Sequence, residues 1–218
     1  MGLAVYGHLF SSYTQKVLIA LYENGTAFEF RAVWPESAHT AEWLRRWPMR
    51  KFPLLLDGDR SVVETSIIIE YLQIKHPGPV RLLPADPMAA LDVRFFDRVF
   101  DLHVMNAAQH AVDGALTGDD AKRRDGLALS VEKLNRVYPW LDAQLAGRTW
   151  ATGADFSMAD CAAAPALFYA DWVHQIPENL TALRAYRARL LARPSVKRAV
   201  EDARPFRPLF PLGAPDRD

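Results

Sequence analysis

The spacing of hydrophobic and polar positions divides the chain into two parts. In residues 3–76, short stretches that alternate apolar and polar residues, as strands do, are separated by stretches whose apolar residues recur at helical spacing. The predicted strands are 3–7, 28–33, 53–56 and 59–63, and the predicted helices are 14–24, 39–47 and 66–76. This βαβ, connecting helix and ββα order predicts a small α/β sheet with helices on its faces.

A proline-rich stretch, "HPGPVRLLPADP" at 76–87, follows, and no strand pattern appears after it. We therefore predict an α/β domain over 1–77, a linker over 78–86 and an all-helical domain over 87–218. The helices expected in the second part are 87–113, 120–146 with a bend at Pro139, 157–171, 178–192 and 194–203. The last fifteen residues are rich in proline and are expected to be irregular.

Composition narrows the class of protein. The 26 acidic and 26 basic residues balance, and no basic stripe of the kind that binds nucleic acid is present. No apolar run approaches the length of a membrane span, and the first residues do not read as a signal segment. A single cysteine, Cys161, excludes an intramolecular disulfide framework. We expect a cytoplasmic globular protein without nucleic-acid or membrane partners.

Two short motifs stand out. Ser11 and Ser12 lie where the first strand passes into the first helix, so one of them is expected to cap that helix, and Ser12 is nearer its predicted start. In "ATGADFSMADCAAAPALF" (151–168), Ser157 is followed by Asp160 three residues later, which is the spacing of a capping box. The small residues after this cap predict a helix in the middle of the helical domain.

Several stretches together resemble one family, the serine-type glutathione S-transferases. The similar segments are "SSYTQKV" (11–17), "WPMRKFPLLLDG" (47–58), "ETSIIIEYL" (64–72), "GADFSMAD" (153–160) and "ARPSVKRAV" (192–200). They occur in the family's order and spacing, and the tail after Ala203 has no counterpart. The resemblance implies a thioredoxin-like N-terminal domain, a helical C-terminal domain, a homodimer, and glutathione bound as co-substrate between the domains, with no cofactor.

The resemblance also assigns the chemistry of the serine pair. Glutathione reacts as its thiolate, and a hydroxyl at a helix N-terminus can stabilise that anion. Ser11 matches the family's active serine and is the predicted donor, with Ser12 as the alternative. The competing interpretation of Ser11 is a helix cap without a catalytic role.

The remaining glutathione contacts follow from the same resemblance. Phe52 and Pro53 match a pair joined by a cis peptide bond, whose backbone would bind the cysteinyl part of glutathione. Glu64 and Thr65 would bind the γ-glutamyl part at the start of a helix. The glycine carboxylate would meet Lys51, with Arg50 and His39 as weaker candidates.

The electrophile pocket is expected between Phe10, Trp34 and the long helix at 87–113, where Phe100 and His103 belong to an aromatic stripe with Phe96 and Ala107. Such a stripe is also typical of a core. His103 and His110 share a helix face, but no metal site is expected. A row of alternating charges on the same helix would either pair across a dimer interface or simply meet solvent: Arg94, Asp97, Arg98 and Asp101.

Three functions agree with these residues. The first is conjugation of glutathione to a small hydrophobic electrophile. The second uses the same site for glutathione-dependent isomerisation or dehalogenation. The third is a non-catalytic glutathione-binding or regulatory protein, since a fold does not fix a function. The absence of cysteine at positions 11 and 12 argues against a thiol transferase, which needs a protein thiol.

Overall fold

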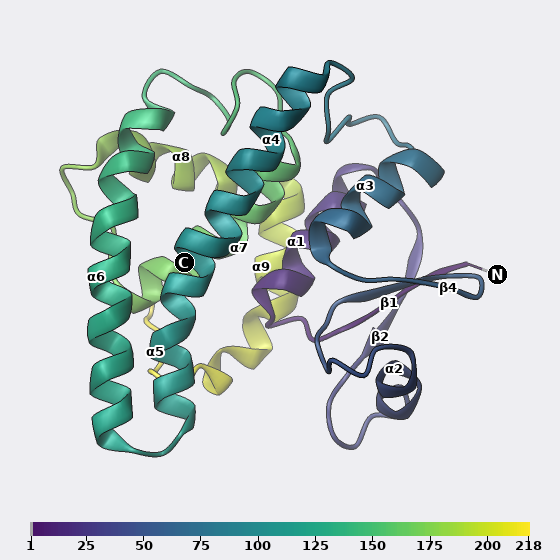
Figure 1. Ribbon diagram of the computed structural model, residues 1–218, viewed down its shortest axis with the longest axis horizontal. Helices are drawn as coiled ribbons and strands as arrows, with labels where there is room; N and C mark the ends of the chain where they lie inside the picture. Colours follow the sequence, from purple (N-terminus) through teal and green to yellow (C-terminus); the bar gives the residue numbers. More distant parts are fainter. Residues whose placement is uncertain (1) are drawn as a thin grey trace.

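A four-stranded sheet forms the centre of the N-terminal part in the computed structural model, which describes residues 2–218 (Figure 1). Its strands are β1 (Leu3–Gly7), β2 (Phe28–Ala32), β3 (Leu54–Asp57) and β4 (Arg60–Val62). They lie in the order β2-β1-β3-β4, with β1 parallel to β2 and antiparallel to β3, and with β3 and β4 as an antiparallel hairpin. The predicted strands are confirmed to within one or two residues at their ends.

Helices cover both faces of the sheet. Alternate side chains of β1 point to opposite faces, and each face packs against different helices. The helices are α1 (Ser12–Glu23), α2 (Thr40–Arg46) and α3 (Thr65–Lys75). Leu3 and Val5 pack with residues of α1 and α3, whereas Ala4 and Tyr6 pack on the opposite face with Trp43 of α2. Successive side chains of a strand point to opposite faces, so the apolar residues of β1 serve two cores at once.

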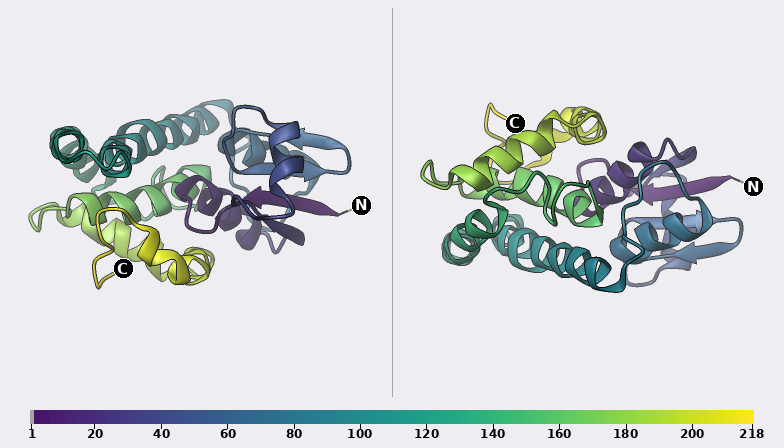
Figure 2. Two further views of the ribbon diagram at one scale, coloured as in Figure 1. Left: turned by 90° about the horizontal axis from the view of Figure 1, so that it is seen from below. Right: turned by 90° about the horizontal axis from the view of Figure 1, so that it is seen from above.

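The C-terminal part is entirely helical, as expected, and lies beside the sheet domain (Figure 2). Its elements are α4 (Pro87–Val99), the π-helix η1 (Phe100–Met105), α5 (Asn106–Leu116), α6 (Asp120–Leu145), α7 (Met158–Val173), α8 (Thr181–Ala192), α9 (Pro194–Ala203) and the 3-10 helix η2 (Arg204–Leu209). The tail expected to be irregular thus begins with a short helix, because Pro205 and Pro208 fix φ near helical values. Within 2–218, no helix has the length and apolar character needed to span a membrane.

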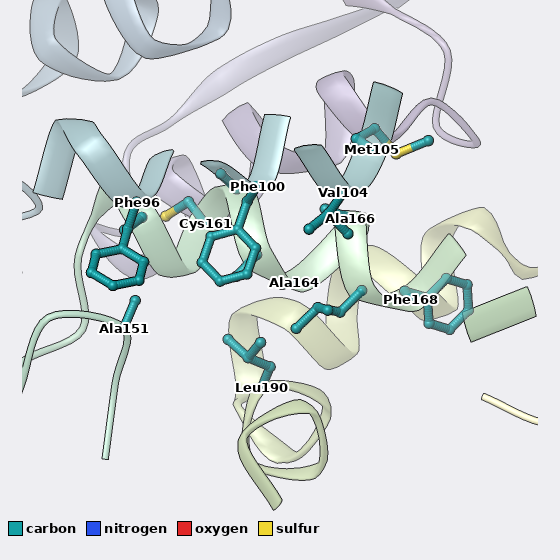
Figure 3. Close-up of a cluster of buried hydrophobic side chains, with 14 of the residues drawn as sticks. Phe96, Phe100, Val104, Met105, Ala151, Cys161, Ala164, Ala166, Phe168 and Leu190 are labelled. Atoms are coloured by element: carbon teal, nitrogen blue, oxygen red, sulfur yellow. The ribbon is translucent and has the colours of Figure 1, made fainter. Parts of the chain in front are cut away.

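The alanine-rich helix α7 is the centre of the helical domain, as its small residues predict. Fifteen of its sixteen residues are buried, and side chains from α4, η1 and α8 close around it (Figure 3). At its start, Asp160 accepts a hydrogen bond from the Ser157 backbone N–H at 2.8 Å, as the capping-box spacing predicts. Asp160 also accepts from the Tyr186 hydroxyl at 2.6 Å and from the Ala151 N–H at 2.8 Å. A single carboxylate therefore ties the start of α7 to α8 and to the preceding loop.

The segment between α3 and α4 has no regular structure but is firmly packed. Leu82 is buried in the helical core, and its carbonyl accepts from the Met158 N–H at 2.8 Å. The side-chain amide of Gln73 donates to the Leu83 carbonyl and accepts from the Leu83 N–H, at 2.9 and 2.8 Å. The segment therefore anchors α3 to the helical domain. The division of the chain into domains at residues 77 and 87 remains a prediction from the sequence.

Candidate active site

A cavity of about 710 Å³ opens where the two domains meet. Nine of the residues predicted for the site line it: Phe10, Ser11, Ser12, Arg50, Lys51, Phe52, Pro53, Glu64 and Thr65. They come from three separate stretches of the N-terminal domain, the β1–α1 turn, the loop before β3 and the start of α3. The opposite wall is formed by η1, α5, the end of α7 and the C-terminal tail.

Ser11 is the N-cap of α1, and the expectation that Ser12 would take this role is wrong. The Ser11 Oγ accepts a hydrogen bond from the Thr14 backbone N–H at 3.3 Å, and Ser12 is the first residue of the helix. The helix starts two residues earlier than the apolar spacing suggested, because a polar first turn does not show in a hydrophobic pattern. A hydroxyl has one hydrogen and two lone pairs, so this cap leaves the Ser11 hydrogen free to donate elsewhere.

The turn that carries Ser11 is fixed by its own backbone. The Ser11 N–H donates to the His8 carbonyl at 2.9 Å, and the Phe10 N–H donates to His8 Nδ1 at 3.2 Å. Gly7 precedes the turn, and a Cβ at this position would lie 2.7 Å from the Thr14 Oγ1, so only glycine lets α1 pack this closely on β1. The serines are therefore held at one place on the cavity wall.

The loop before β3 confirms the expected cis peptide bond between Phe52 and Pro53. This loop is held from behind by α2. The indole N–H of buried Trp43 donates to the Lys51 carbonyl at 3.2 Å, and its ring centroid lies 5.8 Å from that of Phe52. Trp43 thus orients the backbone of Lys51 and Phe52 toward the cavity.

Two residues on the cavity wall have a left-handed backbone, Arg50 with φ of 55° and Glu64 with φ of 67°. Neither is glycine, so each carries a conformational cost of about 1–3 kcal/mol, and residues held in this way cluster at ligand sites. Glu64 stands at the N-cap of α3 but its side chain caps nothing. Glu64 and Thr65 line the cavity, so the N-terminus of α3, whose first N–H groups lack a side-chain cap, lies at its wall, and such a terminus favours an anion.

Four predicted site residues do not line the cavity: His39, Trp34, Phe100 and His103. Phe100 is completely buried, with its ring 6.4 Å from Phe96 and 6.2 Å from Tyr186, and it points into the helical core (Figure 3). Its placement in the electrophile pocket is wrong, because the aromatic stripe of α4 and η1 faces α7 and forms core. The exposed His103 and Trp34 lie outside the cavity as well.

The wall opposite the serines carries apolar side chains that are not among the predicted site residues, together with polar Asn106, Gln109 and Asp113. It includes Leu102 and Met105 of η1 and a stripe along α5: Ala108, Val112 and Leu116. Leu209, Phe210 and Pro211 of the C-terminal tail close one side. The helical spacing of Met105, Ala108 and Val112 is the sequence signal of these side chains, but the aromatic stripe beside it is more prominent.

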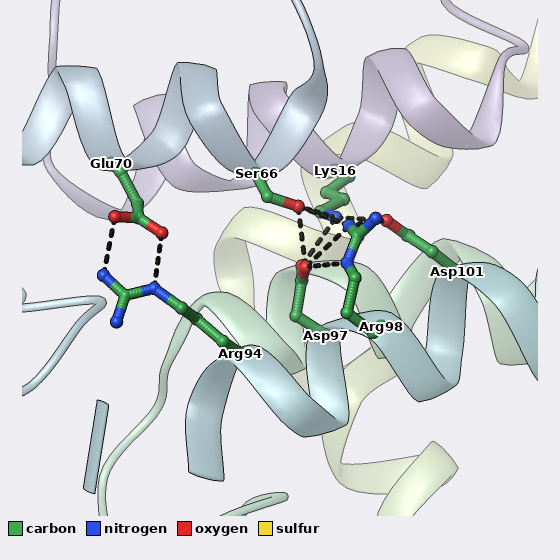
Figure 4. A network of polar contacts seen from close by, with 7 residues as sticks. All are labelled: Lys16, Ser66, Glu70, Arg94, Asp97, Arg98 and Asp101. Atoms are coloured by element: carbon green, nitrogen blue, oxygen red, sulfur yellow. Dashed lines mark hydrogen bonds and ion pairs between the residues drawn. The ribbon is translucent and has the colours of Figure 1, made fainter. Parts of the chain in front are cut away.

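A buried ionic network lies at the edge of the cavity and joins α1 to α4 and η1 (Figure 4). Lys16 is 1% exposed, and its Nζ lies 2.6 Å from Asp97 Oδ1 and 2.7 Å from Asp101 Oδ2. The Arg98 guanidinium donates to both carboxylates at 2.8 and 2.5 Å. Both interpretations offered for the row of charges are therefore wrong for Asp97 and Asp101, which pair inside their own chain.

Burial sets the protonation of the groups nearest to this network. Burial raises the pKa of the Asp101 carboxyl, although Lys16 opposes the shift. Burial, with a contribution from the Asp101 charge, raises the pKa of the Tyr13 phenol to about 12. Tyr13 also lines the cavity and stays protonated at neutral pH. Within 2–218, no three histidine, cysteine or acidic side chains are grouped as a metal site.

The fold and the cavity together define a class: a thioredoxin-like domain joined to a helical domain, with a ligand site between them. Family models match both domains, the "Glutathione S-transferase, N-terminal domain" over residues 5–80 and the "Glutathione S-transferase, C-terminal domain" over residues 110–189. The chain belongs to the glutathione S-transferase family.

Individual relatives carry different names. A glutathione S-transferase from Methylobacterium radiotolerans, solved in complex with glutathione sulfonate, is 31% identical, with a TM-score of 0.76 and coverage of 91% of this chain and 94% of the other. A Vibrio cholerae protein named "Probable maleylacetoacetate isomerase" is 28% identical over 94% of this chain and 98% of its own. A "Stringent starvation protein A homolog" from Coxiella burnetii is 25% identical over 88% of each chain.

Proposed function

We propose that the protein is a serine-type glutathione transferase, which conjugates glutathione to a hydrophobic electrophile. The observation that carries the proposal is the convergence of Ser11, the Phe52–Pro53 cis peptide and the start of α3 on one cavity, whose opposite wall carries a row of apolar side chains. Glutathione occupies the N-terminal side of this cavity, and the electrophile occupies the side formed by η1, α5 and the tail. Because the co-substrate is a reduced thiol, we expect the protein to work in the cytoplasm.

Ser11 supplies the activation of the thiol. A free thiol has a pKa near 8.5, and lowering it by about two units requires about 2.7 kcal/mol of stabilisation of the thiolate. A hydrogen bond to a charged partner contributes roughly 1.5–3 kcal/mol, and a helix N-terminus roughly 0.3–1 kcal/mol. Ser11 offers both, since it caps α1 through a lone pair while its hydrogen donates to sulfur. The cap and the catalytic role are therefore compatible rather than alternatives.

The other contacts hold the tripeptide in place. The backbone of Phe52 pairs with its cysteinyl unit beside the cis bond, and Lys51, with Arg50 nearby, meets the glycine carboxylate. The γ-glutamyl carboxylate binds at the start of α3 with Thr65. The Glu64 carboxylate, which makes no hydrogen bond to cap this helix, accepts from the α-amino group of glutathione. His39 has no part in this proposal because it lies outside the cavity.

The test is the pH dependence of turnover in Ser11→Ala. At neutral pH the variant should lose about 10- to 100-fold in kcat, as expected for about 1.5–3 kcal/mol of lost thiolate stabilisation, and the loss should shrink above about pH 9, where glutathione ionises unaided. Calorimetry should show glutathione binding close to wild type. Ser12→Ala serves as the matched control and should lose little. A pH profile identical to wild type in Ser11→Ala would refute the donor role.

Isomerisation is the second candidate, and the relative named as a probable isomerase favours it. Isomerisation would use the same thiolate, but glutathione would be released unchanged at the end of each turnover. Measuring whether glutathione is consumed in step with the substrate separates the two reactions. A protein that binds glutathione but turns over neither class of substrate would instead be a regulatory member of the family.

We also propose that the protein is a homodimer, with α3 and α4 at the interface. Large apolar side chains are exposed along both helices: Ile67, Ile74, Met88, Leu91 and Phe95. Five large apolar side chains exposed on two neighbouring helices, which the Arg94–Glu70 pair joins, favour an interaction site. Phe95→Glu should convert the dimer into monomers in sedimentation velocity, whereas Leu127→Glu, at an exposed position of α6 outside the proposed interface, should not. A wild-type protein that sediments as a monomer would refute this proposal.

A further inference from the structure

The short turn between β1 and α1, which carries the serine pair, is held by side chains of two helices. The Gln15 amide of α1 donates to the Leu9 carbonyl at 2.9 Å. The Tyr169 hydroxyl of α7 donates to the Phe10 carbonyl at 2.9 Å. An amide does not titrate, and burial raises the pKa of the Tyr169 phenol above its usual range. These two contacts therefore do not change near neutral pH.

His8 supplies a third contact to this turn, and this one depends on pH. The His8 Nδ1 accepts from the Phe10 N–H at 3.2 Å, and the His8 carbonyl accepts from the Ser11 N–H at 2.9 Å. The first bond needs a lone pair on Nδ1, so the imidazole must be neutral with its proton on Nε2. A second proton would place a hydrogen on Nδ1 opposite that of the Phe10 N–H, and the attraction would become a repulsion.

The imidazole is held in this orientation by the C-terminal part of the chain. Phe206 of η2 meets the His8 ring edge to face, with the ring centroids 4.8 Å apart. His8 is half-buried, and burial lowers its pKa from the ordinary value of about 6.5. The ring is therefore neutral at pH 7 and accepts from Phe10, and it takes up a proton only in more acidic solution.

Neighbouring charges do not set this titration, since burial is its cause. Strand β1 carries no charged residue. The charged side chains of η2, α1 and β2 are paired with partners: Arg204 and Arg207 with Asp218, Lys16 with Asp97 and Asp101, Glu23 with Arg193, and Arg31 with Glu29. The state of the His8 ring thus follows the pH of the solution.

We propose that His8 is a positioning residue for Ser11. Its neutral ring holds the Phe10 N–H, and with it the turn from which the Ser11 hydroxyl reaches the cavity, and a proton on Nδ1 releases this turn. A displacement of about 1 Å in a catalytic group can cost about 100-fold in rate. The effect on catalysis rests on the proposed function, because Ser11 acts there on the thiol of glutathione. The effect on the turn itself does not involve glutathione.

His8→Asn separates the hydrogen bond from the titration. An asparagine Oδ1 stands at the same number of bonds from the main chain as Nδ1 and accepts a hydrogen bond, but it does not take up a proton. At pH 7, kcat should stay within about 2-fold of wild type, whereas His8→Leu, which offers no acceptor, should lose about 3- to 10-fold. Below the midpoint of the His8 titration, the ratio of kcat in His8→Asn to kcat in wild type should rise about 3- to 10-fold.

Amide NMR of the free protein tests the same link without glutathione. The backbone N–H signals of Phe10 and Ser11 should titrate with the midpoint of the His8 ring in wild type, and they should stay constant over this pH range in His8→Asn. His174→Asn is the matched control, since His174 is also half-buried, bonds Asn135 through its ring and does not line the cavity. It should change neither the kcat profile nor the amide titration. Circular dichroism establishes that each variant is folded.

The proposal and the proposed function can fail separately. A ratio of kcat in His8→Asn to wild type that is the same at every pH would refute the positioning role. Phe10 and Ser11 signals that do not follow the His8 ring would refute it as well, and equal losses in His8→Asn and His8→Leu at pH 7 would reduce His8 to a packing residue. Amides that titrate as expected in a protein that neither binds nor consumes glutathione would refute the proposed function and leave the link between His8 and the turn standing.

Discussion

Replacing Lys16 by methionine tests whether the buried ionic network holds the two domains together. Lys16 reaches from α1 to the carboxylates of Asp97 and Asp101, at 2.6 and 2.7 Å, and donates to the Ser66 hydroxyl at 3.1 Å. Methionine has a similar length and no charge. The substitution therefore removes the ammonium and leaves the packing of the stem nearly unchanged, with two buried carboxylates that share the single guanidinium of Arg98.

The expected loss follows from the burial of these groups. The side chains of Lys16 and Asp97 are each 1% exposed, and that of Asp101 is 7% exposed. Removing one partner of a buried ion pair costs about 3–5 kcal/mol because the remaining charge stays desolvated. This is a large share of a total stability of about 5–15 kcal/mol. For a chain of this size it corresponds to a fall of about 6–20 °C in the melting temperature.

The pH dependence of this loss has a definite sign. Burial raises the pKa of Asp101 in the folded state, so its contribution favours the fold at low pH and is lost as pH rises through the folded pKa. Without Lys16, which lowers that pKa, the carboxyl takes up a proton at higher pH than in wild type. The stability difference between wild type and Lys16→Met should therefore be largest near neutral pH and smaller near about pH 5.

Urea unfolding with a check of reversibility measures these differences. Arg94→Met is the matched control, since Arg94 forms a bidentate pair with Glu70 in the same region but is exposed, and such pairs contribute about 0–1 kcal/mol. A loss in Lys16→Met no larger than in Arg94→Met, or a difference that does not change with pH, would refute the reasoning.

Two further changes test the anchors of α7 and α9. Asp160→Ala leaves the buried donors of Ser157, Ala151 and Tyr186 without an acceptor, and it should lower the free energy of unfolding in urea by at least about 3 kcal/mol. Tyr186→Phe removes only one donor and should lower it by about 1 kcal/mol. Equal losses in the two variants would contradict this. Glu23→Gln weakens the bonds from Arg193 and Ser195 that join α1 to α9 and should cost about 1–3 kcal/mol, whereas the same change at exposed Glu201 should have no measurable effect.

Structural features that depend only on residues near one another in the chain could be predicted from the sequence. The strands and most helices follow from apolar periodicity, which the packing of Leu3 and Val5 on one face of β1 illustrates. The reach of Asp160 back to Ser157 follows from a spacing of three residues. The cis bond before Pro53 was predicted from the family resemblance and not from any physical signal in the chain.

Features that depend on contacts between distant residues could not be predicted. The charges of Asp97 and Asp101 look like an exposed row until α1 brings Lys16 against them. The left-handed backbone at Glu64 has no local cause in the sequence, since the fold around it imposes the conformation. The position of Phe100 in the core depends on which face of η1 meets α7, and a hydrophobic stripe alone does not say which partner covers it.

The π-helix η1 is a wide turn between α4 and α5 at the edge of the cavity. A π-turn takes up one residue more than an α-helix needs, so the helices before and after it keep nearly the same winding phase. Asp101 of this turn pairs with buried Lys16, while Leu102 and Met105 of the same turn line the cavity. Removing one residue within 100–105 would close the turn and leave the buried faces of α4 and α5 where they are. A one-codon deletion would therefore change the side chains that this turn presents to the cavity without repacking the helices on either side.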